Sequence, residues 1–296
     1  MVTRRRDQAK RVYFVTDLEG VCGVDDWDPR HASYGSQAQG VYERSEMQRL
    51  LTGEINAAAD GCLAGGADEI LVNDTHGAGR TILVEELRSG VRLYRGTDRP
   101  YWLPGFDDSY DALLQVGMHA KSNTPYGTLT HTCTFDVREY RLNGLSVGEM
   151  GIAAAIAGYF GVPWVFVSGD LHACREAERL AKGIVTAPVK EGISRQSAVH
   201  LSPADARELI RERAAEGVRR AKAIDPVVFK PPYELVVEWR KEVFSKAKVQ
   251  GPGADFIDER TVRYHGRDLL VVLNHAIHGK RRLPDRHVLS AGWFRP

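Results

Sequence analysis

The chain has 296 residues, of which 43% are hydrophobic and 27% charged, and its formal net charge at pH 7 is +1. This length allows one large hydrophobic core or two smaller ones. The balanced charge gives no general attraction to nucleic acid or to an anionic membrane surface, so we expect neither as a partner.

The sequence carries no pattern of a targeting signal. Its basic N-terminus lacks the apolar stretch and cleavage site of a signal peptide, and no window approaches the roughly 20 apolar residues of a membrane helix. We therefore expect a cytoplasmic protein. The four cysteines are scattered without a CxxC pair, which argues against a disulfide framework and against a cysteine zinc knuckle.

The first strand is predicted at 12–16, where apolar and β-branched residues run directly into Asp17, Glu19 and Gly20. Asp17 and Glu19 lie two positions apart, so on an extended backbone their carboxylates point to the same side. Two carboxylates at the end of a buried strand repel each other unless a cation or protons lie between them. The pattern indicates either a metal site at the strand end or a capped strand with one solvated acid.

Helix and strand patterns alternate after this first strand. The sequence predicts a loop at 21–40, helices at 42–65, 145–160 and 173–182, and strands at 69–74, 91–94, 111–117, 163–168 and 184–189. Such alternation is typical of βαβ units. We therefore expect an α/β fold with a mainly parallel sheet flanked by helices, and with the site at the carboxyl ends of its strands.

The pattern changes near residue 200. Ser202 and Pro203 start an amphipathic helix expected to reach about residue 223. Beyond a Pro-Pro break, the sequence predicts a strand at 234–239, a helix at 241–248, a strand at 261–264 and a final helix from about 267. We expect an α/β catalytic domain at 1–200 and a smaller α+β portion at 201–296, packed on it and involved in oligomer contacts.

Histidines follow two of the predicted strands. His76 and His119 come just after the second and fourth strands, and His131 lies in a loop 12 residues beyond His119. Glu149 adds a carboxylate near the start of a helix rich in glycine and alanine. Each has an ordinary alternative, since such a histidine is often a hydrogen-bonded loop residue and such a glutamate complements a helix dipole.

Residues that follow parallel strands meet at one edge of the sheet, so these side chains form one donor set. Three carboxylates and two imidazoles suit Zn²⁺, Mn²⁺ or Co²⁺ better than Ca²⁺. Five ligands are too many for one tetrahedral zinc, and we expect two metals about 4 Å apart that share a carboxylate. The expected ligands are Asp17, Glu19, His76, His119 and Glu149.

Five spaced motifs carry a family resemblance. They are Asp17-Leu18-Glu19-Gly20, Asn73-Asp74-Thr75-His76, Gly117-Met118-His119-Ala120, Thr130-His131-Thr132 and Val147-Gly148-Glu149-Met150-Gly151. In this order they resemble the DppA-type D-aminopeptidase family of zinc peptidases. The likeness runs from about residue 12 to at least residue 205, and the C-terminal third matches only in general character.

The resemblance implies a dinuclear zinc amide hydrolase that releases N-terminal D-amino acids from short peptides by metal-activated water. It also implies two Zn²⁺ per chain on the five expected ligands, a catalytic role for His131, and a homodecamer whose sites face an inner channel. For His131 we favour acid–base chemistry or oxyanion stabilisation over direct nucleophilic attack.

Some residues depart from the family pattern. Gly169-Asp170-Leu171-His172 replaces a Gly-Asp-Asp run, the Thr-His-Thr segment replaces Ser-His-Ser or Ser-His-Thr, and the C-terminal Asn274, His275 and His278 look distinctive. These departures leave a non-peptide amide or a hydrazide as an alternative substrate. Asp74, Asp170 and His172 are candidates for orienting a metal ligand or binding the substrate amine.

Two further alternatives belong to other classes of function. A dinuclear phosphoesterase needs cations near the metals, and only Arg80 and Lys121 are candidates. A metal-stabilised oligomeric scaffold needs a closed site in which protein fills every metal position, whereas a catalytic site keeps one position open. The presence of His131 beside five ligands favours the catalytic interpretation.

Overall fold

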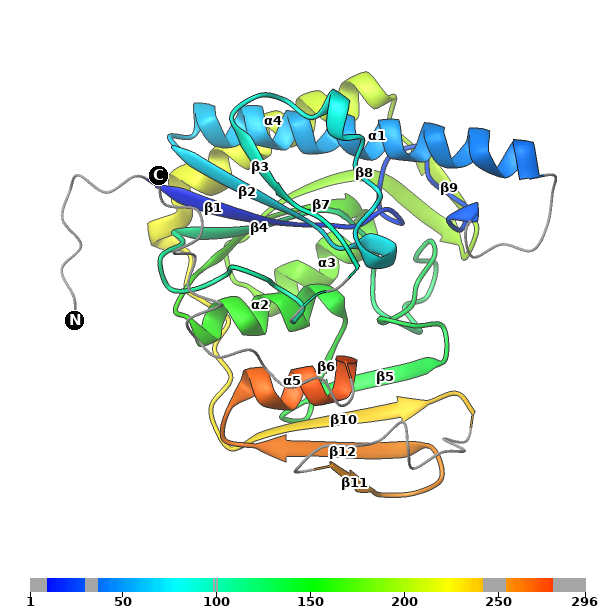
Figure 1. Ribbon diagram of the computed structural model, residues 1–296, viewed down its shortest axis with the longest axis vertical. Helices are drawn as coiled ribbons and strands as arrows, with labels where there is room; N and C mark the ends of the chain where they lie inside the picture. The colour runs from blue at the N-terminus through cyan, green and yellow to red at the C-terminus, as the bar shows by residue number, and fades with distance from the viewer. Residues whose placement is uncertain (1–9, 30–36, 98, 100, 242–253, 279–296) are drawn as a thin grey trace.

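The computed structural model describes residues 10–29, 37–97, 99, 101–241 and 254–278 (Figure 1). Two sheets organise the chain, with strand orders β3-β2-β1-β4-β7-β8-β9 and β11-β12-β10-β5-β6. The seven-stranded sheet is parallel except for its last pair, β8 and β9. The expected α/β fold with a mainly parallel sheet is confirmed.

The seven strands are β1 (Arg11–Thr16), β2 (Glu69–Asp74), β3 (Val91–Tyr94), β4 (Ala112–Met118), β7 (Trp164–Asp170), β8 (Val185–Ser194) and β9 (Ser197–His200). The central strands β1, β4 and β7 are apolar runs because both faces of the sheet are covered there. Every residue of β4 and β7 is buried. These two strands therefore form the centre of the core.

Helices cover both faces of this sheet (Figure 1). Helices α1 (Gln37–Ala64) and α4 (Pro203–Arg220) lie together on one face, and α2 (Glu149–Tyr159) and α3 (Leu171–Leu180) lie on the other. Three short 3₁₀ turns complete the described helices: η2 (His76–Ala78), η3 (Val84–Glu86) and η4 (Ala221–Ala223).

The second sheet is antiparallel and joins distant parts of the chain. Its strands are β5 (Val137–Leu142), β6 (Leu145–Val147), β10 (Tyr233–Trp239), β11 (Ala254–Phe256) and β12 (Thr261–Gly266). Helix α5 (Leu269–His278) packs on β10 and β12 and lies between this sheet and α2 (Figure 1).

Several element boundaries differ from the sequence prediction. The expected helix at 145–160 begins only at Glu149, because 145–147 pair with β5 as strand β6. Strands β5, β6, β9 and β11 were not predicted, and α1 begins at Gln37 rather than at residue 42. The helix expected at 241–248 lies, apart from its first residue, outside the described residues.

Elements from before and after residue 200 pack together. Hairpin β5–β6 pairs with β10 in the second sheet, while α4 packs on α1 and on the first sheet. The division into 1–200 and 201–296 stays a prediction. Within the described part of the chain, no helix has both the length and the apolar character needed to cross a membrane.

Candidate metal centre

The neighbouring strands β1, β2 and β4 end side by side, and polar residues follow each end. Asp17 comes directly after β1, and His76 and His119 follow β2 and β4. The turn after β1 approaches its neighbour so closely that a Cβ on Gly20 would lie 2.0 Å from the carbonyl oxygen of Met118. Glycine at this position therefore allows the two ligand-bearing turns to touch.

Asp17, Glu19 and His76 form a first triad, and all three are buried. The Nδ1 atom of His76 lies 3.0 Å from Asp17 Oδ1 and 2.9 Å from Glu19 Oε2. Its other nitrogen, Nε2, lies 3.3 Å from Oδ2 of the buried Asp28. A carboxylate on the far nitrogen fixes the imidazole so that Nδ1 faces the triad.

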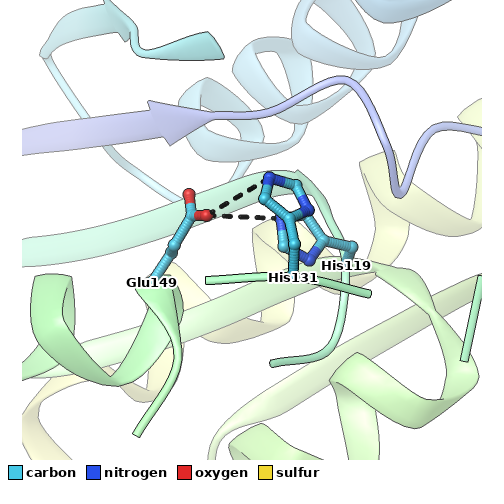
Figure 2. Close-up of side chains that lie close together, drawn as sticks. All are labelled: His119, His131 and Glu149. Atoms are coloured by element: carbon cyan, nitrogen blue, oxygen red, sulfur yellow. Dashed lines mark ion pairs between the residues drawn. The ribbon is translucent and has the colours of Figure 1, made fainter. Parts of the chain in front are cut away.

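His119, His131 and Glu149 form a second triad beside the first. Figure 2 shows the glutamate reaching from α2 toward both imidazoles, and His119 Nε2 and His131 Nε2 each lie 3.6 Å from Glu149 Oε1. The two rings stack with centroids 4.1 Å apart. The backbone N–H of Cys133 donates to the same Glu149 oxygen at 2.7 Å, which holds the carboxylate in place.

Backbone carbonyls set the tautomers of the second triad. The Nδ1 atom of His119 lies 2.8 Å from the carbonyl oxygen of Ala120, and that of His131 lies 2.9 Å from Leu129 O. A carbonyl oxygen only accepts, so each Nδ1 carries the proton. In a neutral ring the lone pair is therefore on Nε2, the nitrogen that faces the centre.

Asp17 joins the two triads. Its Oδ1 atom faces His76 of the first triad, and its Oδ2 atom lies 3.2 Å from His119 Nε2 of the second. One carboxylate thus reaches both groups, as the sequence prediction of a shared carboxylate requires.

The carboxylates and imidazoles shift one another's protonation. Burial by itself lowers the pKa of His76 and His119, but nearby carboxylates, chiefly Glu19 for His76 and Asp17 for His119, raise both pKa values well above 6.5. Burial has the opposite effect on the carboxyl groups and raises the pKa of Asp17 and Glu149, but the effect of the imidazoles is larger. They lower the pKa of Asp17 well below 3.8 and that of Glu149 to about 2.

The donor set fits zinc. Three of its buried atoms make no hydrogen bond of acceptable geometry among the described residues, although they lie within ion-pair distance of an imidazole or a carboxylate: Asp17 Oδ2, Glu19 Oε2 and His119 Nε2. Such atoms are costly to bury unless a cation or a proton satisfies them. Mixed carboxylate and imidazole donors are the ligands that Zn²⁺ takes in catalytic sites.

The two triads open onto a cavity of about 770 Å³. Apolar side chains of Trp102, Phe135 and Ile277 form part of its wall, and Asp136 adds a carboxylate. Asp17, Glu19, His76, His131 and Glu149 also line it. A pocket of this size admits a short peptide or another small amide.

Comparison with known proteins decides the family. The sequence profile of the D-aminopeptidase family, peptidase M55, matches residues 10–276. The chain belongs to this family. It is 32% identical over 264 residues to the D-aminopeptidase of Bacillus subtilis (strain 168), covering 88% of this chain and 93% of that protein.

The fold of this M55 chain is also similar to a solved structure, a Zn-dependent D-aminopeptidase DppA from Bacillus subtilis described as a self-compartmentalizing protease. The TM-score is 0.82 at 28% sequence identity, and the match covers 97% of this chain and 100% of that one. The family resemblance read from the five motifs is confirmed.

Three sequence candidates of the M55 chain lie away from the triads. Asp74 accepts from the backbone N–H groups of Thr81 and Ile82, and Asp170 caps α3 and accepts from Thr128 N. His172 Nε2 lies 3.2 Å from a backbone carbonyl of β8. None of the three is among the described residues that line the cavity, so their expected roles stay predictions.

The sequence analysis missed Asp28 and Trp27, which lie in the loop after β1. Asp28 contacts His76, and the Trp27 ring packs edge-on against His131 with centroids 5.7 Å apart. The only sequence signal for these two residues was that the loop after the first strand is polar and long enough to shape a site. Of the C-terminal residues, Asn274 is buried and His275 half-buried in α5, while the side chain of His278 lies outside the description.

Proposed function

We propose that this M55 chain is a dinuclear zinc aminopeptidase that hydrolyses the peptide bond after an N-terminal D-amino acid in short peptides. The observation that carries the proposal is the pair of buried triads, joined by Asp17, at the base of a 770 Å³ cavity. The similar Bacillus proteins, described as D-aminopeptidase and as Zn-dependent, support the reaction and the metal.

Five residues would hold the two ions. Glu19 and His76 would hold one ion, His119 and Glu149 would hold the other, and Asp17, which reaches both triads, would contribute to both. Zinc bound there supplies Lewis-acid polarisation of the scissile carbonyl and acidifies a water molecule. Mn²⁺ and Co²⁺ have similar ligand preferences and are alternative metals.

His131 is the proposed catalytic residue. Its Nδ1–H donates to Leu129 O, so its Nε2 atom, which borders the cavity, is left to exchange protons with the substrate. A proton held on Nε2 passes to the leaving amine as the C–N bond breaks. Trp27 and Phe135 pack against the ring and hold it at the cavity wall.

The assembly is proposed to be a closed homo-oligomer, with a decamer expected from the family resemblance. The description of the similar Bacillus structure as self-compartmentalizing supports assembly from copies of one chain. Sedimentation-velocity mass measurement of the purified protein tests this, and a monomeric mass would contradict it.

A substrate panel tests the reaction. Zinc-loaded protein is incubated with D-Ala-D-Ala, L-Ala-L-Ala, N-acetyl-D-Ala-D-Ala, a simple acyl amide, an acyl hydrazide and phenyl phosphate, and products are quantified with and without chelator. We expect cleavage of D-Ala-D-Ala only, lost with chelator. The acetylated peptide is the matched control, since it keeps the amide and removes the free amine.

Each other result selects an alternative. Cleavage of the amide or hydrazide alone keeps the metal chemistry and moves the substrate outside peptides. Phosphate release indicates a phosphoesterase, for which Arg99 is the Lys or Arg side chain among the described residues that line the cavity. Two bound zinc ions without any turnover of the panel favour the scaffold.

Replacing His131 with Ala tests its role separately. We expect kcat to fall by about 10² to 10⁴, with two zinc ions retained per chain, because general acid–base catalysis contributes about that factor. Metal content by mass spectrometry accompanies the kinetics. Loss of one zinc in this variant makes His131 a ligand of the second triad instead, and near-full activity removes it from the reaction.

A further inference from the structure

Lys190 lies buried behind the first triad, on β8, with 3% of its surface exposed. Its ammonium group donates to the carbonyl oxygen of Glu19 at 2.6 Å and also to that of Val24. Both acceptors belong to the loop after β1. A lysine from a distant strand thus reaches under the loop that carries a ligand of the first triad.

Side chains of two other elements hold the same loop. Glu54 of α1 accepts from the backbone N–H of Cys22 at 2.8 Å, and His200 Nδ1 at the end of β9 accepts from Gly23 N at 2.9 Å. The loop has no strand or helix of its own here, so these side chains satisfy backbone groups that secondary structure would otherwise pair.

Burying an ammonium group costs free energy that neutral carbonyl partners offset only in part. At Lys190 the cation lies against the backbone of Glu19, whose carboxylate belongs to the first triad. The hydrogen bond fixes the start of the loop and with it the position of Glu19. The lysine charge by itself repels a divalent cation, so the gain in zinc affinity comes from this positioning.

We propose that Lys190 is a positioning residue for the first triad, holding Glu19 through its backbone and so raising the affinity of that triad for zinc. This inference rests on the proposed zinc site. It concerns one of the two ions, because the described contacts of the Lys190 ammonium lie in the loop of Glu19 and none is with His119, His131 or Glu149.

The test is a zinc titration against a competing chelator dye, with chelator-stripped Lys190→Met protein. Met keeps the length and apolar stem of lysine and removes the charge and the hydrogen bonds. We expect one zinc to bind about 10- to 100-fold more weakly and the other to be unchanged within about threefold. A His76→Ala protein identifies the first-triad zinc as the one it loses.

Lys10→Met is the matched control. Lys10 precedes β1 at the opposite end of the same sheet, and its ammonium also donates to a backbone carbonyl, that of Val218, at 3.1 Å. The substitution is chemically the same but lies away from the triads. Both zinc affinities should match the wild type. Lys190→Arg, which keeps a cation and N–H donors, should recover most of the lost affinity.

The outcomes separate the inference from the proposed function. Wild-type protein that binds no zinc overturns the proposed function. Wild-type protein with two zinc ions and a Lys190→Met variant with unchanged affinities overturns the inference alone, even if the metal-free variant melts at a lower temperature. If Lys190→Met does not fold, Lys190→Gln, which retains a donor without the charge, undergoes the same titration, with site-selective weakening again expected.

Discussion

Glu54 is a buried carboxyl group that lies outside both triads. Its Oε1 atom accepts from Cys22 N, while Oε2 has no hydrogen-bond partner among the described residues. Burial raises the pKa of Glu54 from 4.5 to about 7, although the hydrogen bond and the cations of Lys190 and Arg207 oppose the shift. The folded chain therefore keeps this group neutral over a range in which the unfolded chain ionises it.

Glu54→Gln should remove a pH dependence of stability. A raised folded-state pKa gives stability that is fully present below about pH 4.5 and is lost as pH rises through about 7. The variant lacks that loss, so its free energy of unfolding relative to wild type should rise with pH, by up to about 3 kcal/mol. Urea unfolding of metal-free protein from pH 4.5 to 8 measures the difference.

Glu46→Gln, on the exposed side of the same helix, is the control for that series. Because both chains share every other titrating group, the difference between wild type and variant isolates one carboxyl. A Glu54→Gln difference that stays flat across the pH range would show that the buried carboxyl does not carry a raised pKa.

At the scale of elements, close packing of α1 on α4 depends on glycine. A Cβ on Gly61 would lie 2.2 Å from the carbonyl oxygen of Arg211 in α4. That oxygen belongs to the helix backbone and cannot swing aside as a side chain can. The two helices cover the same face of the parallel sheet, so any separation there also loosens their packing on the strands (Figure 1).

Gly61→Ala should therefore destabilise the fold, by about 1–3 kcal/mol, despite the better helix propensity of alanine. Gly40→Ala in the same helix is the control, since among the described residues its new Cβ meets only Pro29 Cβ, at 3.4 Å, and the change should stabilise by up to about 1 kcal/mol. Chemical denaturation gives both values. Equal stability of the two variants would contradict the close helix contact.

The elements and residues that sequence could predict are those set by local pattern. Strand β4 is an apolar run, and the ligands near it follow from the rule that parallel strands end together. Strand β5 pairs with β6 across the Asn143-Gly144 turn, a local hairpin signal that the sequence prediction did not use. Its other partner, β10, lies about a hundred residues away, and no local pattern carries that pairing.

The same distinction holds within the site. Asp17, Glu19, His76 and His119 follow strands of the parallel sheet, where the sequence signal is strong, whereas His131 lies in a loop and Glu149 begins α2. Asp28 reaches His76 only because the loop after β1 folds back onto the turn after β2. Lys190 reaches Glu19 from β8, which lies three strands from β1 in the same sheet. These supporting contacts depend on tertiary packing, which composition and spacing do not encode locally.

At the scale of the whole molecule, the cavity draws on both sheets. Its floor comes from the strand ends of the parallel sheet, while Phe135 and Asp136 directly precede β5 and Ile277 lies on α5. The segment from Cys133 to Glu149 both carries a ligand and forms the hairpin of the second sheet. Metal binding and the docking of the second sheet are therefore coupled through one stretch of chain.

Zinc removal should consequently destabilise the whole fold. A ligand present at 100 times its Kd stabilises by about 2.7 kcal/mol per site, so two sites give about 5 kcal/mol. For a chain of this size that is a shift in Tm on the order of 10 °C. Calorimetry of zinc-loaded and chelator-stripped protein measures it. Mg²⁺, which prefers oxygen ligands, is the control and should not restore the loss.

The zinc effect should also depend on pH in a fixed direction. In metal-free protein, protons on His76 and His119 replace the cation between the carboxylates, because those carboxylates hold both pKa values well above 6.5. The metal-free fold keeps this stabilisation at low pH and loses it as pH rises through the raised pKa values, whereas zinc binds the deprotonated imidazoles. The difference in Tm between the two forms should widen from pH 6 to pH 9. A difference that is constant or narrows with rising pH would show that the imidazoles do not exchange protons for metal.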